Sequence, residues 1–402
     1  MRVSTTQFYN QNGLQMSNQQ AGVNEQVSYI SSGKRVMTAK DDAVAYGTLS
    51  GYKDDLASIE KYKRNIIQAQ NHNGLIDTSL KNAEGIMDEL KSLMLQANSG
   101  SRSADDLASI AAQANQNLQQ ILDIANSQNE TGGYVFSGYK IDDAPFVLQA
   151  DNVVNYRGDN GTRELQIAKN VSVVTNQSGE QVFQKVPNAV GDFSATYNTN
   201  TSGIQVTSAT IANPSLYDSA TTPPNFTINF TTETDFTITD GAANVTTVAG
   251  YVPGQPIVAI PGIEITLSGN PLPGDEVVLK PDQDVSVFET IKSAIDWINT
   301  KDVRGEDPQV QVDYNHVLEQ LNDSMNHLTS RRAQSGINLQ VIDGQKNNHL
   351  DTELHLTSSR SAIEDLDFAK AISTFEQSKI ALQAAQQTFT QVQGLSLLNY
   401  IR

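Results

Sequence analysis

Four pairs of adjacent aspartates are the side chains of this sequence best suited to acid–base or Ca²⁺ chemistry. They are Asp41-Asp42, Asp54-Asp55, Asp105-Asp106 and Asp142-Asp143. Carboxylates that converge on one point can transfer protons or bind a cation. Adjacent side chains on a helix diverge, and the pairs at 105 and 142 stand where a helix start and a turn are expected. We therefore predict that none of these pairs is catalytic.

The other reactive residue types do not form a site either. The five histidines, at 72, 316, 327, 349 and 355, lack the spacing of metal ligands. Residues 32–35, SGKR, lack the first glycine and the Ser/Thr of a phosphate-binding loop. There is no cysteine, which excludes disulfides and thiolate nucleophiles. The sequence thus predicts a protein that is not an enzyme and needs no cofactor or metal.

The composition indicates several folding units and argues against two classes of partner. A chain of 402 residues exceeds the size at which a single core keeps growing. Its net charge of -18 repels phosphate backbones, so we expect no nucleic acid partner. No stretch approaches the ~20 apolar residues of a membrane helix, and the N-terminus lacks the apolar core of a secretory signal. We therefore expect no membrane insertion and no cleaved signal peptide.

Seven-residue spacing dominates the C-terminal arm. Phe368, Phe375, Leu382 and Phe389 lie seven apart, and a second track of smaller residues follows three positions behind. Such a pattern places one apolar stripe along a helix, and that stripe needs a partner. The predicted seam comprises Phe368, Ala371, Ile372, Phe375, Leu382, Ala385, Phe389, Val392, Leu395 and Leu398.

The middle of the chain changes from helix to strand and back. Heptad tracks predict a helix over 49–97, in which the single polar member, Asn73, sets the register. Ser103 and Asp106 indicate a capping box that starts a second, antiparallel helix. Short apolar runs, beginning with residues 134–136, then predict hairpins as far as 174, with Arg157-Gly158-Asp159 in a turn. Thr, Asn, Gly and Pro enrichment from 187 to 281 predicts a small β domain, and helical spacing resumes at Phe288.

Four stretches resemble the flagellin-like axial proteins of the bacterial flagellum. Residues 31–43, SSGKRVMTAKDDA, and 358–389 are similar to the N-terminal and C-terminal signatures of that family. Residues 132–146, GGYVFSGYKIDDAPF, and the terminus SLLNYIR resemble the hook-associated branch, whose members stand at the hook–filament junction. One departure is Ala43, where the family commonly has proline.

The resemblance implies a multidomain, mainly α fold. We expect a terminal helical polymerisation domain from 1–45 and 361–402, and a coiled-coil-like helical rod with β-hairpins from 46–186 and 285–360. An inserted outer β domain is expected over 187–284. In the N-terminal arm the expected assembly residues are Phe8, Val23, Val27, Ile30, Gly33, Arg35, Asp41 and Asp42.

The same resemblance implies a structural adapter that joins the hook, through hook-associated protein 1, to the flagellin filament. The expected partners are further copies in a tubular lattice, hook-associated protein 1, flagellin and a flagellar export chaperone that binds the C-terminal seam. Export through the flagellar type III apparatus would place the protein outside the cell, in the flagellum. Two alternatives are a filament-forming flagellin and, more distantly, an adhesin or enzyme housed in residues 187–284.

The two arms carry few apolar side chains for their length. Ordering a residue costs about 1–2 kcal/mol of backbone entropy, whereas a buried large apolar side chain returns about 1.5–3 kcal/mol. The N-terminal arm scatters its apolar residues among Gln and Asn. We therefore predict that both arms are largely disordered in a lone copy and become helical when neighbouring copies surround them.

Overall fold

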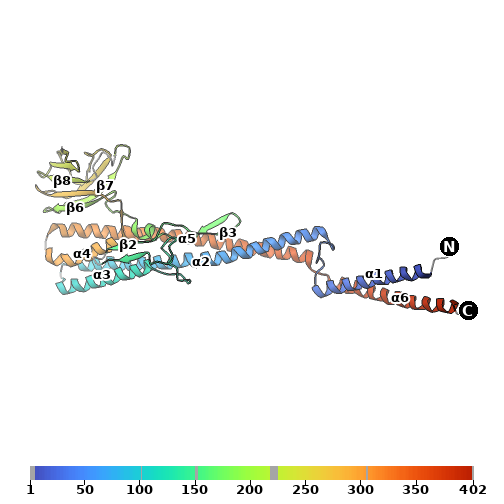
Figure 1. Ribbon diagram of the computed structural model, residues 1–402. Coiled ribbons are helices and arrows are strands. Elements are labelled where there is room, and N and C mark those ends of the chain that lie inside the picture. Colours follow the sequence, from blue (N-terminus) through green and yellow to red (C-terminus); the bar gives the residue numbers. More distant parts are fainter. Residues whose placement is uncertain (1–4, 101, 150–152, 218–224, 305–306, 401–402) are drawn as a thin grey trace. The chain divides into compact units, whose positions relative to one another are not determined.

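The computed structural model describes residues 5–100, 102–149, 153–217, 225–304 and 307–400 (Figure 1). Its α-helices are α1 (Thr5–Ser32), α2 (Ala43–Ala97), α3 (Ala104–Ala125), α4 (Val287–Arg304), α5 (Pro308–Glu364) and α6 (Phe368–Tyr400). One π-helical turn, η1, covers Glu180–Gln184. The mainly α, multidomain fold class with an inserted β-rich region is confirmed.

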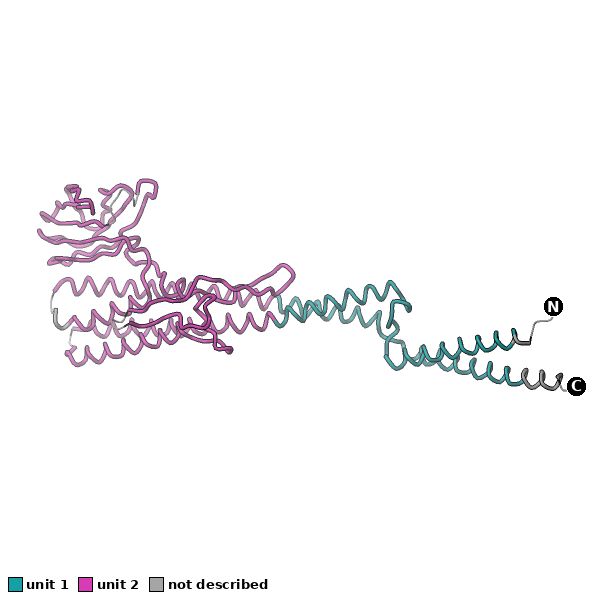
Figure 2. Tube along the Cα trace, in the orientation of Figure 1, with its two compact units in different colours: residues 1–64, 345–402 teal, residues 65–344 magenta. Residues whose placement is uncertain are grey.

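The chain divides into two compact units (Figure 2). The first combines residues 1–64 with 345–402, and therefore contains α1, α6, the start of α2 and the end of α5. In it Tyr62 of α2 stacks on the buried His349 of α5, with ring centroids 5.6 Å apart. Lys63 and Glu353 form an ion pair at 3.0 Å between the same helices. The second unit comprises residues 65–344.

The helical body of the second unit is built on one large apolar core. Residues of α2, α3, α4 and α5 share this core with four phenylalanines: Phe136, Phe146, Phe183 and Phe288. The ring centroid of Phe146 lies 5.5 Å from that of Phe183 and 5.2 Å from that of Phe288, within the range of favourable aromatic pairs. The core therefore joins the helices to the hairpin segment between α3 and the β domain.

Two local predictions about the helices are confirmed. Ser103 and Asp106 form the capping box of α3, each side chain accepting a hydrogen bond from the other residue's backbone N–H. Asn73 is the buried polar member of the α2 track, and its amide donates to the Val174 carbonyl at 3.0 Å. Asn338 of α5 donates to the Asn73 side-chain oxygen at 3.1 Å. These bonds are made only in one register of α2 against α5.

The segment after α3 forms two of the predicted hairpins. Strands β1 (Phe146–Leu148) and β2 (Val154–Tyr156) pair, as do β3 (Glu164–Ala168) and β4 (Val171–Val174). The strand predicted at 134–136 was wrong. Tyr134 N–H donates to the Ile141 carbonyl, and Val135 N–H donates to the Ser127 carbonyl. Because these two consecutive residues bond different segments, the backbone does not pair with a single neighbouring strand.

Arg157-Gly158-Asp159 lies in the irregular connection between β2 and β3, and the Asp159 side chain bonds within this part of the fold. The Asp159 carboxylate accepts from the N–H groups of Tyr139, at 2.9 Å, and Gly161, at 2.7 Å. These bonds hold the pKa of Asp159 below its ordinary value. The predicted hairpin turn was wrong, because this segment connects β2 to β3, which pair with different strands; the Asp159 carboxylate is engaged within the fold.

Two antiparallel sheets make the inserted β domain. The five-stranded sheet has the order β10-β9-β8-β13-β6, and the three-stranded sheet the order β11-β12-β7. The strands are β6 (Phe193–Thr199), β7 (Gln205–Ile211), β8 (Phe226–Phe230), β9 (Phe236–Asp240), β10 (Val245–Val248), β11 (Pro256–Ile257), β12 (Ile263–Ser268) and β13 (Glu276–Pro281). Alternate residues along β8 and β12 are buried in a core separate from that of the helices.

A two-stranded connection links the β domain to the helices. Strands β5 (Val186–Pro187) and β14 (Asp284–Val285) pair at the two crossings of the chain. Gln320 of α5 is buried beside them, where its side chain accepts from Ala189 N–H at 2.8 Å and donates to the Pro187 carbonyl at 3.2 Å. The Gln320 side chain thus satisfies two backbone groups of the connection, the Ala189 N–H and the Pro187 carbonyl.

Asp275 is a fully buried carboxylate in the β domain. Its oxygens accept from the N–H and hydroxyl of Thr201, at 2.8 and 2.9 Å, from Leu272 N–H at 2.8 Å and from the Ser202 hydroxyl. Burial by itself would raise the pKa of Asp275, but the bonds from Ser202, Leu272 and Thr201 outweigh burial and hold that pKa below its ordinary value.

We expect Asp275→Ala to destabilise the β domain by about 3 kcal/mol or more, because several buried donors lose a charged acceptor. Faster amide exchange in β8 and β13, measured by mass spectrometry, would report the change. Glu233→Ala, in an exposed turn of the same domain, removes the same charge and should have little effect. Since the pKa of Asp275 is lowered in the folded state, the stabilisation is present above the unfolded-state pKa of about 4 and is lost as the pH falls below it. Equal exchange in both variants would contradict the assignment.

Candidate assembly site

The two ends of the chain form a pair of antiparallel helices, α1 and α6 (Figure 1). Tyr9, near the start of α1, packs edge-to-face on Phe389, near the end of α6, with ring centroids 5.9 Å apart. At the other end of the pair, the Phe368 ring lies 3.6 Å from the point where a Cβ on Gly33 would stand. The predicted C-terminal seam therefore has the N-terminal arm of the same chain as one of its partners.

The residues of the predicted C-terminal seam differ in exposure. Ala371 and Leu382 are buried. The half-buried members are Phe375, Ala385 and Phe389. Phe368 and Ile372 are about half exposed, at 51% and 50%. Val392, Leu395 and Leu398 lie in α6, but their side chains are outside the part of the chain that the structure describes.

The N-terminal arm buries fewer apolar side chains than the C-terminal arm. Val23, Ile30 and Gly33 are half-buried, whereas Val27 is 47% exposed. Phe8 lies in α1, and its side chain is outside the described part. None of the described apolar side chains of α1 is buried. The helix pair therefore leaves much of its apolar surface accessible.

A polar track in α1 was missed from the sequence. Asn12, Gln19 and Gln26 lie seven apart and are half-buried, so they belong to the face that meets α6. A cavity of about 200 Å³ opens between this face, at Met16 and Gln19, and the small Ala385 of α6. The signal was present as a heptad spacing of amides, but a search for apolar residues does not detect it.

The segment after α1 is held by Asp41 and Asp42, the first of the aspartate pairs. The Asp41 carboxylate accepts from the N–H groups of Met37 and Thr38, both at 2.9 Å, and from the Tyr29 hydroxyl at 2.9 Å. The bonds from Thr38, Met37 and Tyr29 lower the pKa of Asp41 to about 2. Asp42 caps the start of α2 by accepting from Ala45 N–H at 2.9 Å.

Gly33 allows the chain to leave α1. Its φ of +67° is the left-handed conformation that glycine adopts without strain, and its N–H donates to the Tyr29 carbonyl at 2.9 Å. Arg35 then bonds the last turn of α5, its guanidinium donating to the Ile363 carbonyl at 3.2 and 3.0 Å. Leu366 N–H donates back to the Gly33 carbonyl at 3.0 Å. The loops that precede α2 and α6 are therefore joined through their backbones.

A buried carboxylate, Glu364, reinforces the same place. It pairs with Lys34 at 2.7 Å, with Lys53 at 3.3 Å and with Arg360 at 3.5 Å. The hydrogen bond from Lys34, aided by Lys53, lowers the pKa of Glu364. Three basic side chains around one carboxylate fix the loop between α5 and α6 against the end of α1. Sequence patterns did not indicate this residue, because Lys34 and Lys53 come from segments far from it in the sequence.

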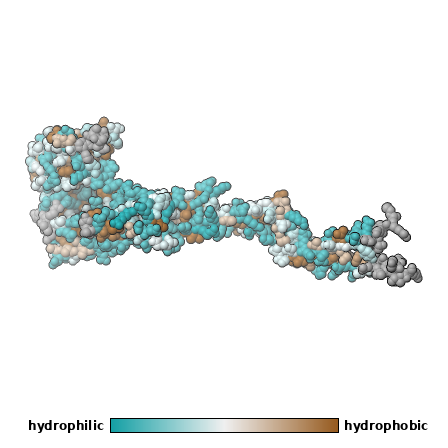
Figure 3. Space-filling model, in the orientation of Figure 1, coloured by the Kyte–Doolittle hydropathy of each residue, from teal (hydrophilic) through white to brown (hydrophobic). Residues whose placement is uncertain are grey.

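The arrangement is suited to binding other protein surfaces. Within the described residues no group of His, Asp or Glu is placed to hold a metal ion. Apolar side chains are instead accessible on both helices of the pair: Leu14, Val27, Phe368, Ile372 and Ile380. The hydrophobic areas on the α1/α6 pair in Figure 3 interrupt a mainly hydrophilic surface. None of the described helices has both the length and the hydropathy needed to cross a bilayer.

Two family models match the ends of the chain. Residues 3–141 match the bacterial flagellin N-terminal helical region, and residues 318–401 match the bacterial flagellin C-terminal helical region. Together these two regions cover more than half of the chain. Both helices of the α1/α6 pair lie entirely inside them.

Full-length relatives and solved structures agree with these matches. The sequence is 24% identical to flagellar hook-associated protein 3 of Escherichia coli over 99% of this chain and 98% of the relative. It is also 24% identical to the protein of the same name from Salmonella typhimurium, over the whole of both. The flagellar junction protein of Legionella pneumophila matches with a TM-score of 0.64 and 25% identity, covering 78% of this chain and all of that one.

Proposed function

Since the chain belongs to the bacterial flagellin family by both its N-terminal and its C-terminal helical regions, we propose that it is the structural adapter at the flagellar hook–filament junction. The observation that carries this proposal is the match to hook-associated protein 3 over the full length of both chains. Its place is accordingly the bacterial flagellum, with hook and filament components as neighbours. Hook-associated protein 1 and flagellin are the neighbours we propose on the two sides.

The α1/α6 pair is the proposed site of self-assembly. Its buried members Ala371 and Leu382 hold the two ends of one copy together. The exposed Leu14, Ile372 and Ile380 then meet the same helices of neighbouring copies in a tubular wall. The incompletely filled face at Gln19 and Ala385 supports this view, because a second copy can complete the packing there.

We further propose a purely structural role and export through the flagellar type III apparatus. The aspartate pairs at 41 and 105 are used as helix caps and turn acceptors, which favours structure over catalysis. Before export, the apolar face of α6 can lie in the groove of a chaperone. The proposed domains are the terminal polymerisation domain (1–45, 361–402), the helical rod (46–186, 285–360) and the outer β domain (187–284).

Deletion of the gene tests the adapter role. We expect mutant cells to carry hooks without filaments, to release flagellin into the medium and to lose motility, all restored by the intact gene. Electron microscopy and blotting of the medium provide the measurements. Filaments that remain firmly attached to hooks in the mutant would refute the adapter role. Growth of long filaments from the purified protein alone would favour the filament-flagellin alternative.

A further inference from the structure

The cavity between α1 and α6 contains a buried amide oxygen that lacks a hydrogen-bond donor. Gln19 Oε1 is buried, and no donor among the described residues bonds it. The cavity measures about 200 Å³, and its lining includes Gln15 and Met16 of α1 and Ala385 and Phe389 of α6. A buried acceptor without a donor is destabilising, and an unfilled space forfeits the contacts that its lining would make. The cavity therefore weakens the α1/α6 pair.

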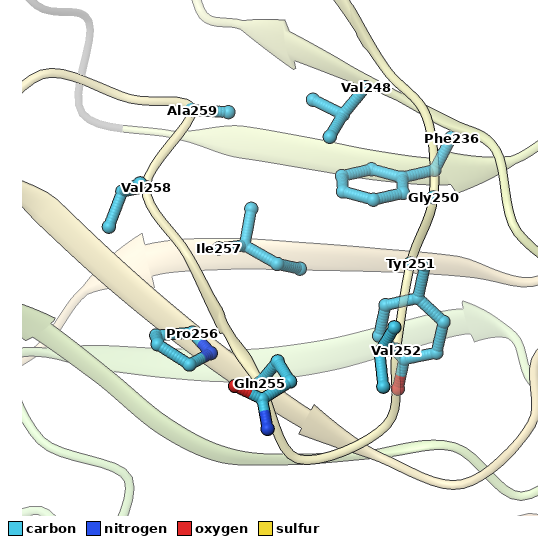
Figure 4. Close-up of a pocket in the computed structure, with 10 residues that line it drawn as sticks. All are labelled: Phe236, Val248, Gly250, Tyr251, Val252, Gln255, Pro256, Ile257, Val258 and Ala259. Atoms are coloured by element: carbon cyan, nitrogen blue, oxygen red, sulfur yellow. The ribbon is translucent and has the colours of Figure 1, made fainter.

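The apolar notch of the β domain differs from this cavity (Figure 4). Its volume is about 330 Å³, and it is lined mainly by apolar side chains, including Phe236 and Ile257. The buried Tyr251 hydroxyl in its lining donates to the Leu267 carbonyl at 3.1 Å, and Gln255 is exposed to water. The polar side chains of the notch are thus satisfied, unlike the amide between α1 and α6.

The cavity adjoins surface that the proposed assembly would cover. Leu14 is 67% exposed and stands next to the lining residue Gln15, which is itself exposed, as is Thr388 on the α6 side. Water can enter a polar cavity of this size, but it does not supply apolar contacts. A side chain with an aliphatic stem and an amide N–H, such as glutamine, suits both the space and Gln19 Oε1.

The exposed side of α1 carries such donors at the spacing of the inner amides. Asn12 and Gln19 lie seven residues apart and are half-buried, whereas Gln11 and Asn18 lie seven apart and are exposed. Each amide side chain has two N–H donors. A second copy whose exposed side of α1 meets this cavity therefore offers amide donors with the matching period.

We propose that an amide side chain of a neighbouring copy enters this cavity and donates to Gln19, and that the unfilled cavity keeps the α1/α6 pair weak until the neighbour binds. The inference rests on the proposed assembly through α1 and α6, and names what completes that site. Donor and acceptor lie on different sides of one helix, so the contact is heterologous and can repeat around a tube. Filling the cavity from within one chain should therefore stabilise the pair and impair assembly.

Ala385→Leu fills the cavity from within. In the dilute full-length protein, we expect the amides from Phe375 to Phe389 to exchange about tenfold more slowly, because the added side chain supplies missing contacts. Cells with this variant should lose attached filaments and swim no better than a strain lacking the gene, since the neighbour's side chain is excluded. Ala385→Ser leaves the space open and should match the unsubstituted protein in both measurements. Ala384→Leu, at the exposed next position, should leave exchange unchanged.

Two further variants test the hydrogen bond. Gln19→Met keeps the length of the side chain but removes the unpaired oxygen, so exchange should slow severalfold while assembly is impaired. Gln20→Met, at an exposed position, is its control for exchange. Gln11→Met combined with Asn18→Leu removes the proposed donors, and should impair assembly without changing exchange in the lone copy.

Three results would overturn the proposal. One is slower exchange in Ala385→Leu with normal filament attachment, because the cavity would then serve no neighbour. Another is unchanged exchange in both Ala385→Leu and Gln19→Met; if the leucine disrupts the pair, Gln19→Met decides alone. The last is normal assembly of the donor variant while Gln19→Met fails, which would assign the cavity to a different flagellar protein. Filaments that stay attached in the deletion strain would instead refute the adapter role, so the two failures are distinguishable.

Discussion

Leu382→Asp is expected to abolish assembly and to reduce motility in soft agar to that of a strain lacking the gene. Leu382 is one of two buried apolar residues among the described side chains of α6, and an unpaired carboxylate at its position would have to be desolvated between α1 and α6. Flagellin in the medium and bare hooks in electron micrographs are the expected readouts. The second unit should remain folded, since Leu382 belongs to the first unit.

Two matched variants make this expectation specific. Gln383→Asp adds the same charge one position along at an exposed residue and should assemble normally. Ile380→Asp adds the charge at a side chain that is 61% exposed within one copy. If neighbouring copies cover that side chain, Ile380→Asp should also block assembly. Normal motility of the Leu382→Asp strain would remove the basis for the proposed site.

In a lone copy at low concentration, we expect the amides of α1 and α6 to exchange almost as fast as those of an unstructured chain. Ordering each residue costs about 1–2 kcal/mol. Against this cost, the described part of α6 buries only Ala371 and Leu382, and the described part of α1 buries no apolar side chain. On this prediction, the α1/α6 pair is the conformation that assembly stabilises. Hydrogen exchange followed by mass spectrometry measures this directly.

In the same hydrogen-exchange experiment, peptides from α2 serve as the internal reference. Peptides from α2 that cover Ile76 and Leu90, which belong to the large core, should exchange slowly in the lone copy. Assembled protein should show slow exchange in both regions. Slow exchange from Phe368 to Phe389 in the dilute monomer would contradict the coupling of folding to assembly.

Repeating apolar patterns made much of the fold predictable. The heptad track of α2, the capping box at Ser103 and the alternation of β8 and β12 each reflect local rules that one segment obeys alone. The strand prediction at 134–136 failed because the backbone partners of this segment depend on the tertiary structure and not on a local rule. Val135 and Phe136 are buried, in agreement with an apolar run. Their segment, however, donates hydrogen bonds to an earlier residue, Ser127, and to a later residue, Ile141, instead of to one neighbouring strand. Burial was predictable there, and the backbone partner was not.

The candidate site was less accessible to sequence reasoning. The apolar track of α6 could be read directly, whereas the face of α1 that meets it carries amides at 12, 19 and 26. Glu364 becomes informative only when Lys34 and Lys53 are placed beside it in space. Polar pairing across distant segments leaves no periodicity in either segment, and it is therefore found only from coordinates.

The antiparallel arrangement of α1 and α6 has a practical consequence for anyone labelling this protein. Because the start of α1 and the end of α6 lie at the same end of the pair, an affinity tag or fluorescent fusion at either terminus would be attached at the same end of the proposed assembly site. An epitope inserted in an exposed turn of the β domain, such as that at Glu233, belongs to the other compact unit and leaves both helices of the pair unmodified. Internal labelling at that turn is accordingly the better strategy for imaging the protein in living cells.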